Sequence, residues 1–207
     1  MPDNILWVIR VLSVKMENGT YKGLLFIYGP KEVLNMLDRF CREMLRNKFY
    51  EMLGKQILFI PVSPGENRKI YSWNIEFFDI GSQKTIQYGY KMRLKNGKTL
   101  VFTGDEPLNA TTIKIGANTD WLLREVLCCY EDEPIFQAYK KKHATLKEAC
   151  METIKMNVKN VVLWHLEDKT DKMIRKQKYL FESRKWISQS NYRPEIFVPN
   201  DGDVIKL

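Results

Sequence analysis

Two residues capable of metal or phosphate chemistry directly follow apolar strands. Asp105 lies in the segment 103–107, Thr-Gly-Asp-Glu-Pro, which comes after an apolar run, and His165 follows the apolar run 161–164. Open α/β folds place ligands at the carboxyl ends of their strands, where a carboxylate or an imidazole can bind a divalent metal ion. The structural alternatives are a Gly-Asp turn in which Asp105 caps the next segment, and a histidine that is hydrogen-bonded at the rim of a sheet.

A third candidate, His143, follows three lysines and precedes Ala144 and Thr145. Its imidazole could act as the general acid for a leaving group or hold a phosphate oxygen. Because we predict a helix over residues 136–156, His143 could equally be an ordinary histidine on a helix surface. His143 and His165 are the two histidines of the chain, which excludes a metal site built mainly from histidines.

The composition is that of a globular protein. The length of 207 residues, with 44% hydrophobic and 28% charged residues, indicates one domain over residues 1–207. No apolar run approaches the roughly 20 residues that a membrane helix needs, and the first residues make a poor signal peptide. The four cysteines contain no Cys-x-x-Cys pair, which favours reduced thiols and a cytoplasmic protein.

The charge of the chain is unbalanced. Its 33 basic and 25 acidic residues give a formal net charge of +8. Basic residues gather at 140–142 and between 169 and 185. A basic face can recruit RNA or another polyanion, although runs of charge are also typical of an ordinary solvated surface.

The apolar patterns predict α/β architecture with mixed sheets and outer helices. Helices are expected at 3–16, 30–44, 136–156 and 169–187. Strands are expected at 23–29, 57–62, 69–80 (with a break near 72–74), 87–94, 98–103, 120–127, 161–164, 196–198 and 204–205. Between 94 and 98, Asn96-Gly97 predicts a hairpin with a two-residue type I′ turn.

The order of four motifs resembles the metallo-β-lactamase superfamily, and within it the ribonuclease Z-like branch. These motifs are 102–107 (Phe-Thr-Gly-Asp-Glu-Pro), 120–125 (Asp-Trp-Leu-Leu-Arg-Glu), 142–149 (Lys-His-Ala-Thr-Leu-Lys-Glu-Ala) and 162–165 (Val-Leu-Trp-His). The segments 77–80, 87–89 and 198–201 extend the similarity over essentially the whole chain. The resemblance implies a metallo-β-lactamase-like αββα sandwich with a two-metal site, usually zinc, that hydrolyses phosphodiesters.

The resemblance also implies roles for individual residues. Asp105 would be the metal-bridging carboxylate and His165 a metal ligand. His143 would contact the scissile phosphate, and Glu125 matches the acidic residue that the family places beside this site.

Several positions depart from the family pattern. The signature His-x-His-x-Asp-His matches the start of the chain, where Asp3 stands for its aspartate and Asn4 for its last histidine. Gly81 stands where the family has a histidine ligand, and Arg124 where it commonly has a histidine. The strands that begin the first sheet precede this match and are missing. We therefore predict that no dinuclear centre forms and that any single site uses Asp3, Asp105 and His165, with zinc, Mn²⁺ or Mg²⁺ as the metal.

Two functions are compatible with these residues. The first is a metal-dependent hydrolase of the phosphodiesterase type, degenerate or inactive as this chain because most metal-binding histidines are absent. The alternative is a non-catalytic basic binding module on the same fold, with nucleic acid or a protein as its partner. The missing strands would leave an uncovered edge at 23–29 or 57–62, which predicts a homo-oligomer or pairing with a separate N-terminal piece.

Overall fold

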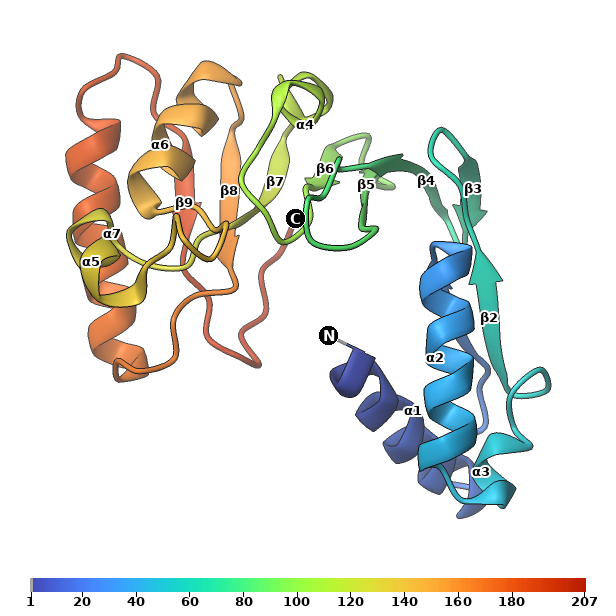
Figure 1. Ribbon diagram of the computed structural model, residues 1–207. Coiled ribbons are helices and arrows are strands. Elements are labelled where there is room, and N and C mark those ends of the chain that lie inside the picture. Colours follow the sequence, from blue (N-terminus) through green and yellow to red (C-terminus); the bar gives the residue numbers. More distant parts are fainter. Residues whose placement is uncertain (1) are drawn as a thin grey trace. The chain divides into compact units, whose positions relative to one another are not determined.

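The computed structural model describes residues 2–207, except for the side chains of residues 2 and 3. The chain divides into two compact units, Met1–Pro64 and Gly65–Leu207, and each is described by itself (Figure 1). No helix among the described residues combines the length and apolar character that crossing a membrane requires.

The N-terminal unit packs three helices with a two-stranded parallel sheet. Its elements are α1 (Pro2–Glu17), β1 (Leu25–Gly29), α2 (Lys31–Met44), α3 (Asn47–Tyr50) and β2 (Ile57–Pro61). The core of this unit contains Ile9, Leu37, Cys41 and Ile57, all essentially inaccessible to solvent. The helices predicted at 3–16 and 30–44 are confirmed, and Pro30 precedes α2 because its fixed φ suits a helix start. The sequence did not indicate α3.

The C-terminal unit is built on a seven-stranded mixed sheet. Its strands, in spatial order, are β3 (Asn67–Ile70), β4 (Trp73–Asp79), β5 (Tyr88–Arg93), β6 (Thr99–Phe102), β7 (Trp121–Glu125), β8 (Asn160–Trp164) and β9 (Glu195–Phe197). The strands from β3 to β6 pair antiparallel, and those from β6 to β9 pair parallel. The connecting helices are α4 (Ala110–Gly116), the 3₁₀ turn η1 (Tyr130–Asp132), α5 (Glu133–Phe136), α6 (Leu146–Lys155) and α7 (Lys172–Ile187).

The core of this unit lies between the parallel strands and the helices α6 and α7, which are drawn beside β8 and β9 in Figure 1. Val101, Leu122 and Val161 come from three adjacent strands and are completely buried. Leu146 and Tyr179 face them from α6 and α7. Continuous apolar runs are typical of parallel strands that are covered, and this explains why β6, β7 and β8 were recognisable in the sequence.

The predicted helix over 136–156 is wrong. The helix α5 ends at Phe136, and α6 begins only at Leu146. Between them Gln137 and Lys142 have positive φ angles of 54° and 58°, which no α-helix accommodates. The start of α6 is set by Thr145 and Glu148, whose carboxylate accepts the Thr145 N–H at 3.1 Å. This Thr-x-x-Glu spacing is a capping box, and it was readable in the sequence.

Two smaller predictions also need correction. The β5–β6 hairpin is confirmed, but its turn is not type I′. Gly97 has a positive φ of 80°, Asn96 does not, and Leu94 pairs with Lys98 across three intervening residues. A type I′ turn requires positive φ at both central residues. The predicted strand at 204–205 is not formed.

Candidate metal centre

Three adjacent parallel strands end at one edge of the large sheet. A polar residue either ends the strand or follows it within three positions. Asp105 comes three residues after β6, Glu125 is the last residue of β7, and His165 directly follows β8. The strand register pairs Glu125 with Trp164, so the ends of β7 and β8 are level. This edge is the place at which open α/β sheets bind ligands.

The backbone is unusual directly before Asp105 and at His165. Gly104 has a φ of 80°, and a Cβ atom there would lie 2.5 Å from Ile80 Cδ1, so glycine is strongly favoured before Asp105. His165 has a φ of 61°, in the left-handed region that few residues other than glycine occupy. Left-handed residues of this kind gather at functional sites, where the surrounding structure holds them in place.

His143 reaches the same edge from the loop between α5 and α6. The segment after it runs beside the segment after β7, with the Leu127 N–H donating to the Ala144 carbonyl at 2.9 Å. Because the Thr145 cap fixes the start of α6 on the other side, the short stretch from 143 to 145 is held at both ends. His143 is buried, so the alternative of an ordinary surface histidine on a helix is wrong.

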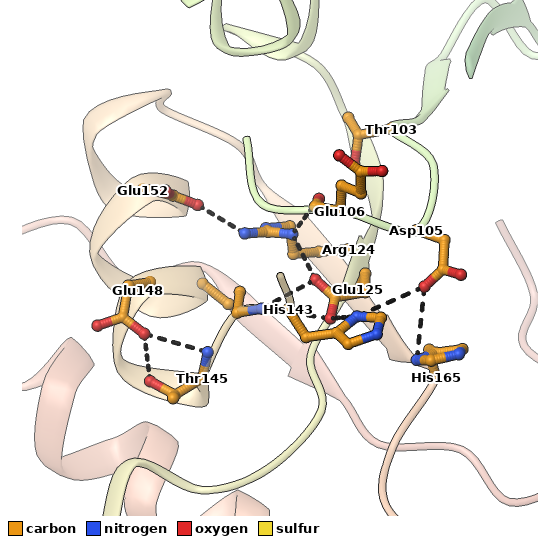
Figure 2. A network of polar contacts seen from close by, with 12 residues as sticks. Thr103, Asp105, Glu106, Arg124, Glu125, His143, Thr145, Glu148, Glu152 and His165 are labelled. Carbon is orange, nitrogen blue, oxygen red and sulfur yellow. Dashed lines mark hydrogen bonds and ion pairs between the residues drawn. The ribbon is translucent and has the colours of Figure 1, made fainter. Parts of the chain in front are cut away.

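The four side chains form one cluster (Figure 2). One ligand atom each from Asp105, Glu125, His143 and His165 lies within 4.8 Å of the others. The Nδ1 atom of His143 is 2.8 Å from Glu125 Oε1 and 3.6 Å from Asp105 Oδ1. The Nδ1 atom of His165 is 3.5 Å from the same Asp105 oxygen. The two imidazole rings stack with centroids 4.9 Å apart.

Glu125 is fully engaged by its protein neighbours. It is completely buried, and besides His143 it accepts the Ala144 N–H at 3.2 Å and pairs with Arg124 Nη1 at 3.2 Å. The Arg124 guanidinium, also completely buried, bonds Glu152 Oε2 at 3.0 Å and the Glu106 carbonyl at 3.4 Å. With all these partners, Glu125 is set to orient His143 through its Nδ1 atom.

Unlike the carboxylate of Glu125, the atoms Asp105 Oδ1 and His165 Nδ1 lack hydrogen-bond partners. Both atoms are buried, although their side chains are 27% and 24% exposed. Zinc binds imidazole nitrogen and carboxylate oxygen at about 2.0–2.2 Å, so two ligands of a tetrahedral ion lie about 3.3–3.6 Å apart. The separation of 3.5 Å between these two atoms fits that geometry. The residues present therefore suit one divalent cation.

A loop between β4 and β5 adds a positive group to this edge. Lys84 Nζ lies 3.3 Å from His143 Nε2. Glu106, which follows Asp105, anchors the loop by accepting the Ser82 hydroxyl and the Gln83 N–H. Burial raises the pKa of Glu106, but these hydrogen bonds and the charge of Lys84 outweigh that effect and lower it below its usual value.

Four of the residues singled out in the sequence lie together at this edge of the sheet. Asp105, Glu125, His143 and His165 form the cluster. The side chain of Asp3 lies outside the described residues, and Gly81 occupies a turn of the 80–87 loop with a φ of 68°. The sequence analysis did not identify Lys84 as part of the site, because no local pattern marks it. It also could not predict the ion pair of Arg124 with Glu152, which depends on the fold.

No protein-family model and no curated protein matches the sequence. Solved structures do match. YhfI of Bacillus subtilis, a metallo-β-lactamase fold protein, aligns with a TM-score of 0.67 and 16% identity over 94% of this chain and 70% of its own. Zinc-bound PqqB from Methylobacterium extorquens aligns with a TM-score of 0.67 and 13% identity, over 89% of this chain and 63% of its own. The short form of human tRNase Z aligns with a TM-score of 0.62 and 14% identity, over 97% of this chain and 72% of its own.

The chain thus spans less than two thirds of the length of PqqB and somewhat more of the other two. Identity at this level establishes a shared fold, which agrees with the mixed sheet and the placement of the cluster at the ends of its parallel strands. The chain therefore has the metallo-β-lactamase fold, with structures of ribonuclease Z type among those it resembles.

Proposed function

We propose that this protein is a metal-dependent hydrolase of phosphodiesters that works with a single metal ion. The observation that carries the proposal is the pair of buried, unpartnered donor atoms on Asp105 and His165, 3.5 Å apart. Buried polar atoms without partners are costly, and a bound cation would satisfy both. Zinc is the first candidate, since the similar PqqB structure is zinc-bound, and Mn²⁺ or Mg²⁺ also suits oxygen-containing ligand sets.

In this proposal Asp105 and His165 hold the metal, and Asp3 remains a candidate for a further ligand. A bound cation supplies Lewis-acid charge and activates water as a nucleophile near neutral pH. The chain offers too few imidazoles for two ions, because Gly81 and Arg124 stand where the family has histidines. We therefore expect weaker hydrolysis than in two-metal relatives.

His143 and Glu125 form the catalytic pair. Glu125 accepts the Nδ1 proton of His143 at 2.8 Å, which leaves Nε2 as the atom that faces the substrate. In that orientation the doubly protonated ring of His143 can contact the phosphate or donate its Nε2 proton to the leaving oxygen. Arg124 pairs with Glu125 inside the protein at 3.2 Å and helps to hold its carboxylate beside His143.

Metal analysis of the purified chain tests this proposal. The chain is stripped with a chelator, reloaded with zinc or Mn²⁺, and its metal content is measured by mass spectrometry. We expect close to one ion per chain, with loss of that ion in the Asp105→Asn, His165→Ala double variant. The exposed Asp201→Asn variant serves as the matched control. A content of two ions would overturn the single-metal site, and no bound ion in the folded protein would overturn metal dependence.

Catalysis is tested on the same samples with bis(p-nitrophenyl) phosphate. We expect slow hydrolysis that requires the added metal and disappears in His143→Ala, a variant expected to retain the metal. Activity that survives chelation would contradict the proposal.

A non-catalytic basic binding module is the second candidate. It is favoured by the exposed lysines 140–142 beside the cluster. Other basic residues contribute less, because Lys178 and Lys185 are paired with Asp132 and Glu131. If metal is absent but the chain binds single-stranded RNA with an affinity that falls steeply with salt, the module is the correct assignment.

A further inference from the structure

The 80–87 loop carries a positive charge to the substrate-facing side of His143. Lys84 Nζ lies 3.3 Å from His143 Nε2, the ring nitrogen that Glu125 leaves available. The two residues are 59 positions apart in the chain, so tertiary structure alone brings them together. The Lys84 residue is exposed, whereas His143 is buried, so the ammonium covers the imidazole from the solvent side.

The loop that bears Lys84 is held in place on both sides. The buried carboxylate of Glu106 accepts the Gln83 N–H at 3.1 Å and the Ser82 hydroxyl. The same hydroxyl accepts the Lys84 N–H at 3.2 Å. On the other side Lys142 Nζ donates to Gln83 Oε1 at 3.2 Å, which ties the loop to the segment that carries His143. The backbone of Lys84 is therefore preorganised, and its flexible side chain can adjust to a ligand.

In its doubly protonated form His143 offers an Nε2–H, and this donor and the Lys84 ammonium, whose nitrogens lie 3.3 Å apart, can both donate to one anionic oxygen. An oxygen about 2.8 Å from each would form a nearly equilateral triangle with them, at the distance of a charge-assisted hydrogen bond. Glu125 and Glu106 do not compete for this position, because Glu125 is paired with Arg124 and both oxygens of Glu106 have donors in the loop. Asp105 approaches the other ring nitrogen, with its Oδ1 atom 3.6 Å from His143 Nδ1.

We propose that Lys84 and His143 Nε2 form an oxyanion subsite that holds a non-bridging oxygen of the substrate phosphate. This inference rests on the proposed function for the identity of the substrate. It adds a positive group, supplied by the chain itself, beside a metal site with too few imidazoles for two ions. Such a group stabilises the charge that grows on the phosphate oxygens during the reaction.

Binding of inorganic phosphate to the metal-stripped and to the metal-loaded chain tests the subsite. The ring nitrogens are followed by ¹⁵N NMR, where only two histidines contribute and single variants assign them. We expect phosphate to shift the His143 signals in both forms of the protein. Lys84→Met should weaken phosphate binding about tenfold to a hundredfold, the range for hydrogen bonds to a charged group, and Lys84→Arg should restore much of it. The exposed Lys95→Met variant is the matched control.

The outcomes separate this inference from the proposed function. Unchanged phosphate affinity in a folded Lys84→Met protein, or an equal loss in Lys95→Met, overturns the subsite and leaves the metal proposal standing. No phosphate binding by the natural chain in the millimolar range also overturns it. Lys84-dependent phosphate binding in a chain that takes up no metal supports the subsite and refutes the hydrolase.

Discussion

Replacing Arg124 by methionine should strongly destabilise the protein, because the guanidinium is completely buried between two carboxylates. Its Nη1 lies 3.2 Å from Glu125 Oε2 and its Nη2 lies 3.0 Å from Glu152 Oε2. Removing one partner of a buried ion pair costs about 3–5 kcal/mol, since the remaining charge is left without compensation. For a chain of this size that loss corresponds to a decrease in melting temperature of roughly 6–20 °C.

The size of this effect should depend on Glu152 and on pH. Burial raises the pKa of Glu152 above its usual value, against the lowering influence of Arg124. A carboxyl whose pKa is higher in the folded state binds its proton more tightly there, so its contribution to stability becomes less favourable as pH rises through that pKa. Without Arg124 this pKa rises further. The loss in Arg124→Met should therefore be largest at neutral pH and shrink as the solution is acidified toward pH 4.5.

Urea unfolding followed by circular dichroism, in metal-free buffer, measures these differences. The double variant Arg124→Met, Glu152→Leu should recover a substantial part of the loss, because the uncompensated charge on Glu152 is then gone. Glu125 keeps its hydrogen bonds from His143 and Ala144 in the absence of Arg124, so it should tolerate the loss of the guanidinium better than Glu152 does. A loss below about 1 kcal/mol, or a loss that is the same at pH 4.5 and pH 7, would refute the reasoning.

Four further predictions are open to simple measurements. The Asp120 carboxylate accepts hydrogen bonds from Lys159 and Thr99, which lower its pKa from 3.8 to about 2. Its stabilisation is present above pH 3.8 and is lost as pH falls through about 2, so Asp120→Asn should cost on the order of 1–2 kcal/mol at pH 7 and flatten acid unfolding curves. Gly89→Ala places a Cβ 2.5 Å from a backbone carbonyl oxygen and should cost about 1–3 kcal/mol; an unchanged thermal melt would contradict this. All four cysteines are buried and unpaired, so a thiol reagent should label them only after urea is added. Because β1 and β2 pair only with each other within the described residues, we predict self-association, and a monomer by light scattering at high concentration would count against it.

The local signals in the sequence identified most of the helices and strands, and they indicated that the site lies at the carboxyl ends of the strands. Apolar runs bounded by glycine and polar residues predicted β1, β2, β6, β7 and β8, because a covered parallel strand is apolar along its whole length. Asp105 and His165 were singled out because each follows such a strand, at the end where α/β folds bind ligands. The missed capping box at Thr145 was a local signal as well, and using it would have separated α5 from α6.

The tertiary structure decided how the charges at this edge are paired. Neither the left-handed backbone at Lys142 nor the contact of Lys84 with His143 follows from any residue type, since both depend on how distant segments pack. The same holds for Arg124, which the sequence showed only as a departure from a histidine. Residue types determine which donors and charges exist, but burial and long-range packing determine which of them lose water and must find a partner. That is why the sequence revealed the candidate ligands, and only the fold revealed which of them still lack a partner.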